Sequence, residues 1–339
     1  MKKLTFFLSL VVTASLIGCS NGQETSGSEA NGETGDSEAA HSLNFGTTQT
    51  EDSQFSAALE ALKEEVEEKS DGEISVNLHY NSSLGDEREM VEAVNMGNLE
   101  GVMTSTGVLS NFVPETSVLD LPFIFRDKEH ARTVMDGEVA DTLAGSLEDS
   151  NFKVLAWAEN GFRHVTNSQH PIENPEDLDG IKLRTMEVSS HQKAFQEMGA
   201  DPTPMGWGEV FTSLQQEVID GQENPLTIIY QSKLFEVQDY LSLTGHVYSP
   251  TAIMVGNDIF EGMSEENQQI LLDAAQTAKT ANYEFIDEVE TENIERLEDE
   301  GMEIIEDVDK EPFMEAVQPV IDEYKSEFPE LYEQIINTN

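Results

Sequence analysis

The chain has 339 residues, and its 67 acidic against 18 basic residues give a formal net charge of −49 at pH 7. Nucleic acid is excluded as a partner, because this charge repels nucleic-acid phosphates. The acidity runs along the whole chain, which is more typical of solubility in a saline or alkaline habitat than of one specific partner. Cysteine occurs once, at Cys19, so neither a disulfide within the chain nor a multi-thiolate zinc site is expected.

Residues 1–18 have the pattern of a signal peptide. Two lysines precede the apolar segment 4–17, which is too short to span a bilayer comfortably as a helix. The small Gly18 before Cys19 resembles the lipobox of bacterial lipoproteins, in which the cysteine receives a diacylglyceryl group and becomes the new N-terminus. We therefore expect an extracytoplasmic protein held on the cell membrane by a lipid on Cys19. The alternative is an ordinary secretory peptide with a chance cysteine.

Residues 19–41 form the predicted tether. From Ser20 to Ala40 the chain contains no large apolar residue and consists mostly of Ser, Gly, Asn, Glu, Thr and Ala, so it cannot bury a core. The remaining length is enough for a large core divided between two domains. No later segment is apolar over enough residues to cross a membrane, so the rest is expected to be soluble.

A first α/β block follows the tether. Strands are predicted at 42–47, 74–80 and 101–105, and helices from Ser53 to the stop at 70–72 and over about 86–96. Further helices are predicted at 127–135 and 139–147, after the apolar run 119–125, and a strand at 153–159. The alternation of strand and helix predicts a layered α/β domain.

A second α/β block begins near residue 180. The pattern predicts strands at 180–186 and 247–255, helices at 189–198 and 207–215, and an apolar piece at 226–230. From Ser264 onward the sequence is helical, and the acidic stretch 282–300 reads as a mostly solvated helix. No repeat of 20–50 residues is visible, which argues against solenoids and propellers.

Two α/β blocks followed by long helices predict a bilobal α/β fold in which the chain crosses between the lobes more than once. The expected first lobe comprises residues 42–160 and about 249–287. The expected second lobe comprises residues 161–248 and about 288–339. Ligands of such proteins bind at the lobe interface, and closure about a hinge is the expected motion.

No catalytic constellation is evident. The seven histidines lie in unrelated contexts, and neither His-Glu-x-x-His nor Gly-x-Ser-x-Gly occurs. Paired carboxylates serve glycosidases, but among 67 acidic residues a chance pair carries no information. We therefore expect a protein that is not an enzyme and that uses no cofactor or metal ion.

Arginine is the more informative residue, because only six are present. Arg163 lies just after the strand predicted at 153–159, and Arg184 lies within the strand predicted at 180–186. A planar guanidinium binds a carboxylate with two parallel hydrogen bonds. The two arginines either converge on one anion at the lobe interface or each pair with a nearby Asp or Glu, and their spacing does not decide between these alternatives.

A family resemblance favours convergence. The residues that carry it occur in six segments: 81–89, 121–126, 161–163, 175–184, 199–205 with Glu209 and Leu214 behind it, and 218–225. In this order, from residue 42 to about 249, the chain resembles the substrate-binding proteins of tripartite ATP-independent periplasmic (TRAP) transporters. That family supplies C4-dicarboxylates, sialic acids, uronates and related organic acids to an ion-driven permease. The implied fold is the bilobal periplasmic-binding-protein fold with a hinge and long C-terminal helices.

The resemblance also implies roles for individual residues in the second lobe. Arg184 is the expected principal clamp on the ligand carboxylate, and Arg163 is expected to be a second carboxylate contact. Asn224 is the expected hydrogen-bonding partner, although an asparagine before Pro225 is also typical of a turn.

First-lobe contacts are implied in the same way. Glu87 resembles the acid that accepts ligand hydroxyl groups in some members, although an acid at a helix N-terminus is also favoured by the helix dipole. Gln49, Thr50 and residues 104–106, including Thr106, are expected contacts, and ordinary loop polarity explains them as well. Trp207 is expected either to line the pocket or to belong to the core.

The expected function is capture of a small organic acid and its delivery to a TRAP-type membrane permease. Two arginines suit dicarboxylates and sugar acids equally, and the 185–187 neighbourhood favours the dicarboxylate-to-uronate part of the family. The nearest alternative is an ABC-type binding lipoprotein, which would share the anchor, tether and lobes. A secreted hydrolase is the alternative from another class, and it would convert its ligand instead of returning it unchanged.

Overall fold

Strands from both blocks join in one mixed sheet. The computed structural model describes residues 40–339, and these contain a nine-stranded sheet of order β2-β1-β3-β8-β4-β7-β5-β6, with β9 paired to β8. The strands are β1 (His41–Gly46), β2 (Ile74–His79), β3 (Gly101–Ser105), β4 (Phe152–Asn167), β5 (Lys182–Thr185), β6 (Asp201–Pro204), β7 (Gly221–Pro225), β8 (Tyr240–Gly256) and β9 (Glu303–Ile305). The predicted signal peptide, Cys19 and the tether up to residue 39 lie outside the described residues.

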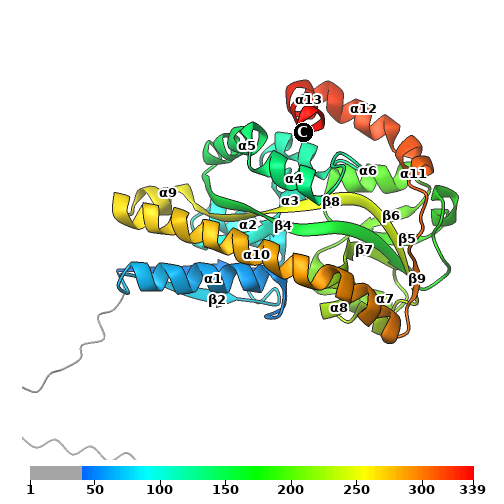
Figure 1. Cartoon of the computed structure of the whole chain (residues 1–339), viewed down its shortest axis with the longest axis horizontal. Helices are drawn as coiled ribbons and strands as arrows, with labels where there is room; N and C mark the ends of the chain where they lie inside the picture. The colour runs from blue at the N-terminus through cyan, green and yellow to red at the C-terminus, as the bar shows by residue number, and fades with distance from the viewer. Residues whose placement is uncertain (1–39) are drawn as a thin grey trace, which may run out of the picture. The chain divides into compact units, whose positions relative to one another are not determined.

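Helices cover the sheet (Figure 1). Those of the first block are α1 (Gln54–Lys69), α2 (Glu87–Asn95), α3 (Thr106–Leu109), α4 (Lys128–Met135) and α5 (Glu138–Glu148). Those of the second block are α6 (Ser189–Glu197), α7 (Val210–Gln215) and α8 (Leu226–Gln231). The C-terminal region contributes α9 (Asn257–Glu261), α10 (Glu265–Asp299), α11 (Glu311–Ala316), α12 (Gln318–Glu327) and α13 (Pro329–Asn337), and short 3₁₀ helices are η1 (Pro114–Asp120), η2 (Pro175–Leu178), η3 (Trp207–Glu209) and η4 (Leu234–Glu236). Within residues 40–339 no helix has the length and apolar character needed to cross a bilayer.

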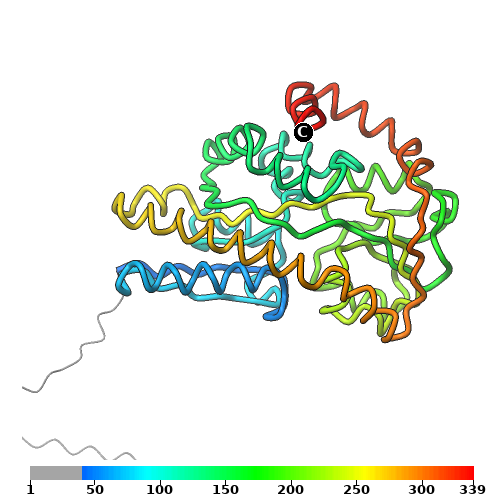
Figure 2. Tube along the Cα trace, in the orientation of Figure 1, coloured from blue at the N-terminus to red at the C-terminus, as the bar shows by residue number. Residues whose placement is uncertain are grey.

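The long strands β4 and β8 connect the two halves of the sheet (Figure 2). They pair antiparallel, β8 continues onto β3, and β4 continues onto β7. We call β1–β3 with α1–α5 the first lobe, and β5–β7 with α6–α8 the second lobe. The α/β bilobal fold expected from the sequence is therefore confirmed, with β4 and β8 as the strands shared by both lobes.

Irregular pairing marks the region where the lobes meet. The register of β4 against β8 shifts between Glu159 and Gly161 and again between Arg163 and Val165. Such bulges bend a strand and increase its twist, and Gly161 has a φ of +118°, which favours glycine. These bulges break the alternation of apolar residues, which explains why the sequence pattern predicts only 153–159 of a strand that continues to Asn167.

Capping and apolar spacing explain the limits and the packing of α1. Ser53 caps α1 by accepting a hydrogen bond from the Ser56 N–H, and the helix ends where Asp71 and Gly72 adopt positive φ. The apolar positions of α1 are buried at helical spacing: Phe55, Ala58, Leu59, Leu62 and Val66. They pack against the sheet and against α10, which lies beside α1 in Figure 1.

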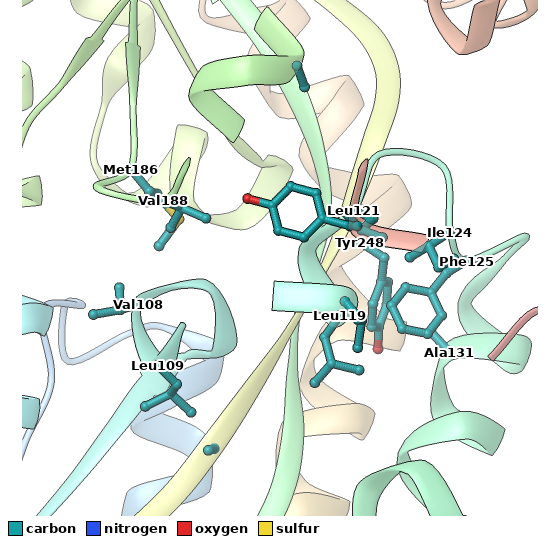
Figure 3. Packing of buried hydrophobic residues seen from close by; sticks show 14 of the residues in the cluster. Val108, Leu109, Leu119, Leu121, Ile124, Phe125, Ala131, Met186, Val188 and Tyr248 are labelled. Atoms are coloured by element: carbon teal, nitrogen blue, oxygen red, sulfur yellow. The ribbon is translucent and has the colours of Figure 1, made fainter. Parts of the chain in front are cut away.

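The apolar run 119–125 lies at the centre of the largest core cluster. Tyr248 of β8 contacts Phe125 with ring centroids 5.4 Å apart and Phe162 at 5.2 Å, both edge to face. Figure 3 shows Val108 and Leu109 of α3 on the first-lobe side of this cluster, and Met186 and Val188 on the second-lobe side. The apolar core therefore extends across the junction of the lobes.

The C-terminal helices contact both lobes. α10 packs on α1 and on β4, α12 packs on α6, and α13 packs on α5. Arg126 of the first lobe donates to the Thr338 carbonyl at 2.7 Å. The exact lobe boundaries in the chain stay a prediction.

Asn282 of α10 anchors this helix to the hinge region. Its side chain accepts the Glu159 N–H at 2.9 Å and donates to the Glu159 and Gln54 carbonyls at 3.0 and 3.1 Å. Replacing Asn282 with alanine leaves these buried backbone groups without partners, so we expect the free energy of unfolding to fall by about 2–4 kcal/mol in urea titrations. Glu284→Ala, an exposed change on the same helix, should shift it by less than about 0.5 kcal/mol. Equal effects of the two substitutions would contradict this role.

Candidate ligand-binding site

Arg184 is a buried cation in β5. Its side chain is 4% exposed, its Nε and Nη2 donate to the Met205 carbonyl at 3.0 and 2.8 Å, and its Cζ lies 5.5 Å from the centre of the Trp207 ring. In the described part of the chain, no carboxylate forms a salt bridge with it, and no hydrogen bond engages its Nη1.

The electrostatic surroundings of Arg184 follow from this burial. Burial lowers the pKa of Arg184 to about 10, and the nearby charge of Arg163 also lowers it, while Glu223, Glu87 and Asp86 raise it. The group is still a cation at neutral pH. Arg163 lies in β4 and Arg184 in β5, and these two strands flank β7 in the sheet.

Arg163 differs from Arg184 because a protein carboxylate neutralises it. It is 1% exposed, and its Nε and Nη2 donate to the two Glu223 carboxylate oxygens at 2.5 and 2.8 Å. Nη2 also donates to the Glu223 carbonyl at 2.6 Å. Burial alone would raise the pKa of Glu223, but Arg163 and His246 hold it well below its ordinary value. The alternative in which an arginine pairs with an acid therefore describes Arg163, and its Nη1 has no hydrogen bond to residues 40–339.

One neutral histidine, His246, bonds to Glu223, and a second, His164, bonds to the backbone next to His246. Burial lowers the pKa of His246, so at neutral pH its Nε2 donates to the Glu223 carboxylate at 3.1 Å and its Nδ1 accepts from the Thr244 hydroxyl at 2.8 Å. Burial also lowers the pKa of His164, to about 3, and its Nδ1 accepts the Gly245 N–H at 3.1 Å. The network fixes the Glu223 carboxylate from two sides.

Glu87 shares a cavity with Arg184. Its Oε1 accepts from the Ser105 N–H at 2.9 Å, the Ser105 hydroxyl at 3.0 Å and the Thr104 hydroxyl at 3.3 Å. These bonds fix the carboxylate at the end of β3, and Oε2 accepts no hydrogen bond from the residues that the structure describes. The cavity lies between the lobes, Trp207 and Met186 also line it, and its volume is about 20 Å³.

The other residues predicted to bind the ligand differ in burial and in their hydrogen-bond partners. Asn224 is buried, and its Nδ2 donates to Gln222 Oε1 at 2.6 Å. Gln49 is buried and donates to the Thr48 hydroxyl at 3.0 Å, whereas Thr50 lines a second cavity together with Trp207. The Thr106 hydroxyl is bonded to Asp120 at 2.8 Å and to the Pro250 carbonyl at 3.2 Å. The structure therefore brings Arg184, Glu87 and Trp207 around one cavity. The other predicted residues do not line this cavity: Arg163, Asn224, Gln49, Thr50 and Thr106.

Sequence reasoning missed several residues of this site. Glu223 lies within the segment 218–225 that carries the resemblance. An acidic residue in this polar segment was the available signal for a partner of Arg163. Asp86 and Met205 likewise lie within the segments 81–89 and 199–205 that carry the resemblance. His246 gave no comparable signal, because it acts through a contact that forms only in the folded chain. Among the side chains of residues 40–339, no group of three or more His, Cys, Asp or Glu is arranged to hold a metal ion.

A two-lobed sheet with a buried cation at the junction of the lobes is typical of a binding protein that closes on an anionic solute. Residues 45–327 match the family "bacterial extracellular solute-binding protein, family 7". The chain belongs to this family and is a solute-binding protein of the TRAP transporter type.

Relatives that match more than four fifths of the chain support this family assignment. A solute-binding protein of Verminephrobacter eiseniae is 43% identical over 286 residues, which are 84% of this chain and 85% of the relative. The 2,3-diketo-L-gulonate-binding periplasmic protein YiaO of Escherichia coli is 39% identical over 281 residues, 82% of this chain and 85% of that protein.

Solved structures of the same type superpose closely. A TRAP periplasmic solute-binding protein from a Polaromonas species, with bound D-erythronate, is 41% identical with a TM-score of 0.87, covering 88% of this chain and 99% of that one. One from Chromohalobacter salexigens, with bound D-glucuronate, is 32% identical with a TM-score of 0.84, covering 87% and 98%. The TRAP assignment is confirmed over the ABC-type alternative, and the family consists of binding proteins and not of hydrolases.

The Arg163–Glu223 pair gives a pH-dependent prediction. The folded-state pKa of Glu223 lies below the ordinary value of 4.5, so the pair stabilises the fold fully above pH 4.5 and less as the pH falls. We expect Glu223→Gln to lower the free energy of unfolding by about 3–5 kcal/mol at pH 7, because Arg163 loses its buried partner. In urea titrations below pH 4.5, the free energy of unfolding of Glu223→Gln should come closer to that of the natural protein.

The exposed Glu288 provides the control for that titration. Glu288→Gln should leave stability within about 0.5 kcal/mol of the natural protein at each pH. A difference for Glu223→Gln that stays constant from pH 7 to about pH 3.5 would show that the carboxylate charge is not what stabilises Arg163.

Proposed function

We propose that this protein captures a sugar acid, such as an aldonate or a uronate, between its lobes and delivers it to a TRAP-type membrane permease. The observation that carries the proposal is Arg184, a 4% exposed guanidinium for which residues 40–339 supply no carboxylate partner. A buried charge without a partner is costly, and a ligand carboxylate supplies the missing negative charge.

The proposed clamp uses the free donors of the two arginines. Arg184 Nη1 is the principal contact, because Nε and Nη2 are held by the Met205 carbonyl. Arg163 Nη1 is the second contact, with the rest of that guanidinium held by Glu223. Each hydrogen bond to a charged group contributes roughly 1.5–3 kcal/mol. Asn224, next to Glu223 in β7, supplies a further hydrogen bond to the same ligand.

Glu87 supports a sugar acid over a C4-dicarboxylate. Its Oε1 is fully engaged at the end of β3, and its free Oε2 can only accept hydrogen bonds while the group is ionised. A second ligand carboxylate would be repelled there, whereas a ligand hydroxyl would donate to it. The relatives with bound D-erythronate and D-glucuronate carry polyhydroxylated acids of this kind.

Transport follows from closure of the lobes. A ligand that neutralises Arg184 binds the closed form better than the open form and shifts the population toward it. The permease would then recognise the closed form. The lipid proposed on Cys19 would keep the protein near that permease, and Gln49 and Thr50 would add first-lobe contacts to the ligand.

Arg184→Ala tests the clamp. A thermal-shift screen of aldonates, uronates and C4-dicarboxylates first selects the acid that stabilises most, since a ligand at about 100 times its Kd stabilises by about 2.7 kcal/mol. Calorimetry with that acid should then show Kd raised at least about 100-fold in Arg184→Ala, because two charge-assisted hydrogen bonds are lost. The unliganded variant should still fold.

Arg126→Ala is the matched control, because the Arg126 side chain donates to backbone carbonyls of the C-terminal segment. This substitution should leave Kd unchanged within about threefold. An unaltered affinity in Arg184→Ala would refute the clamp. Preferential stabilisation by C4-dicarboxylates would refute the role given to Glu87.

The lipid anchor has its own test. Cys19→Ser removes the thiol that would carry the diacylglyceryl group, so we expect the protein to move from the membrane fraction to the soluble fraction of the producing cells. Incorporation of labelled palmitate should be lost with it. Equal membrane retention of the two forms would contradict anchoring through Cys19.

A further inference from the structure

Asp86 of the first lobe makes a direct contact with the second lobe. It immediately precedes α2, and its N–H donates to Glu89 Oε2 at 3.0 Å. Its Oδ1 accepts the Gly208 N–H of η3 at 3.0 Å and lies 3.4 Å from the Ser82 hydroxyl. One carboxylate is thus bonded by groups of both lobes.

Gly206 provides the space for this contact. A Cβ atom at this position would lie 2.7 Å from Asp86 Cγ and closer still to Oδ2. The Gly206 backbone has φ −60° and ψ 156°, which any residue adopts. Glycine at this position therefore permits the close approach of the Asp86 side chain and does not serve a special backbone conformation.

The segment 205–208 that Asp86 contacts is also the segment that surrounds Arg184. The Met205 carbonyl accepts two hydrogen bonds from Arg184, and the Trp207 ring covers its guanidinium. On the other side, Glu87 follows Asp86 directly and lines the same cavity. The contact therefore fixes the distance between the residues proposed to hold the two ends of the ligand.

We propose that Asp86 is a positioning residue that latches the 206–208 turn in the closed form and so slows release of the bound acid. The proposal rests on the function proposed above, because it requires a ligand at Arg184. Asp86 itself need not touch the ligand. An ion pair across this rim, Arg88 with Glu187, is 3.9 Å long with side chains 51% and 41% exposed, and exposed pairs of this kind contribute little.

The latch acts on the rate of dissociation. The Asp86–Gly208 hydrogen bond joins the two lobes, so in the proposed latch its loss destabilises the closed form and not the open one. We expect Asp86→Ala and Gly206→Ala each to raise the dissociation rate of the ligand about tenfold or more, with the association rate changed less than about threefold. Asp86→Asn keeps an Oδ1 acceptor and should stay within about threefold of the natural rate.

The measurement is stopped-flow tryptophan fluorescence on the full chain, with D-erythronate and D-glucuronate as probes. Trp207 reports on the site, and a Trp157→Phe background removes the only other tryptophan. Asp127→Ala is the matched control, because Asp127 caps α4 by accepting the His130 N–H at 2.8 Å and has no role in the cleft. It should lower stability as Asp86→Ala does through loss of a helix cap, yet leave both rates unchanged.

The outcomes separate the two proposals. Natural dissociation rates in Asp86→Ala and Gly206→Ala, with loss of binding in Arg184→Ala, would overturn the latch and leave the proposed function intact. Full affinity in Arg184→Ala would overturn the proposed function. If Asp86→Ala does not fold, Gly206→Ala decides alone, because it keeps Asp86 as the N-cap residue of α2.

Discussion

The proposed binding site depends on one buried charge, the guanidinium of Arg184. In a chain of net charge −49, Arg184 is held in the interior, and no carboxylate within residues 40–339 neutralises it. Arg163, in contrast, is neutralised by Glu223, because it donates to both carboxylate oxygens, and His246 donates to the same carboxylate. The pair contributes little net charge, so Arg184 is the cation at the junction of the lobes that lacks a carboxylate partner within residues 40–339. An anionic solute is the natural partner of such a site.

The fold makes this arrangement possible. β5 carries Arg184 next to β6 and β7, β7 carries Glu223, and the bulged β4 carries Arg163 to the same region. Glu87 and Asp86 approach from α2 in the other lobe. Because the two sides are connected through β4 and β8, a change in lobe angle changes the distance between Arg184 and Glu87. In the proposed mechanism, ligand binding and closure are therefore coupled through the strands shared by the lobes and through the contacts of the 205–208 segment.

Sequence patterns anticipated the first lobe well, because α1, β2, α2 and β3 obey simple periodicity. They missed β6 and β7, since Asp201–Pro204 contains two prolines and Gly221–Pro225 is almost entirely polar. These strands form because neighbouring strands and buried polar partners satisfy them, which no local pattern reveals. The sequence did not identify the partner of Arg163 for a similar reason. Glu223 lies 60 residues away in the chain, and only the pairing of β4 with β7 brings the two together. Arg184 and Glu87 were predicted through the family resemblance, and the structure lines one cavity with both.

The most direct test of the account is a crystal structure of the protein grown with the sugar acid that stabilises it most. The account predicts the ligand carboxylate within hydrogen-bonding distance of Arg184 Nη1, and a ligand hydroxyl donating to Glu87 Oε2. A structure in which the acid binds elsewhere, while Arg184 keeps only its bonds to Met205 or pairs with a protein carboxylate, would contradict it.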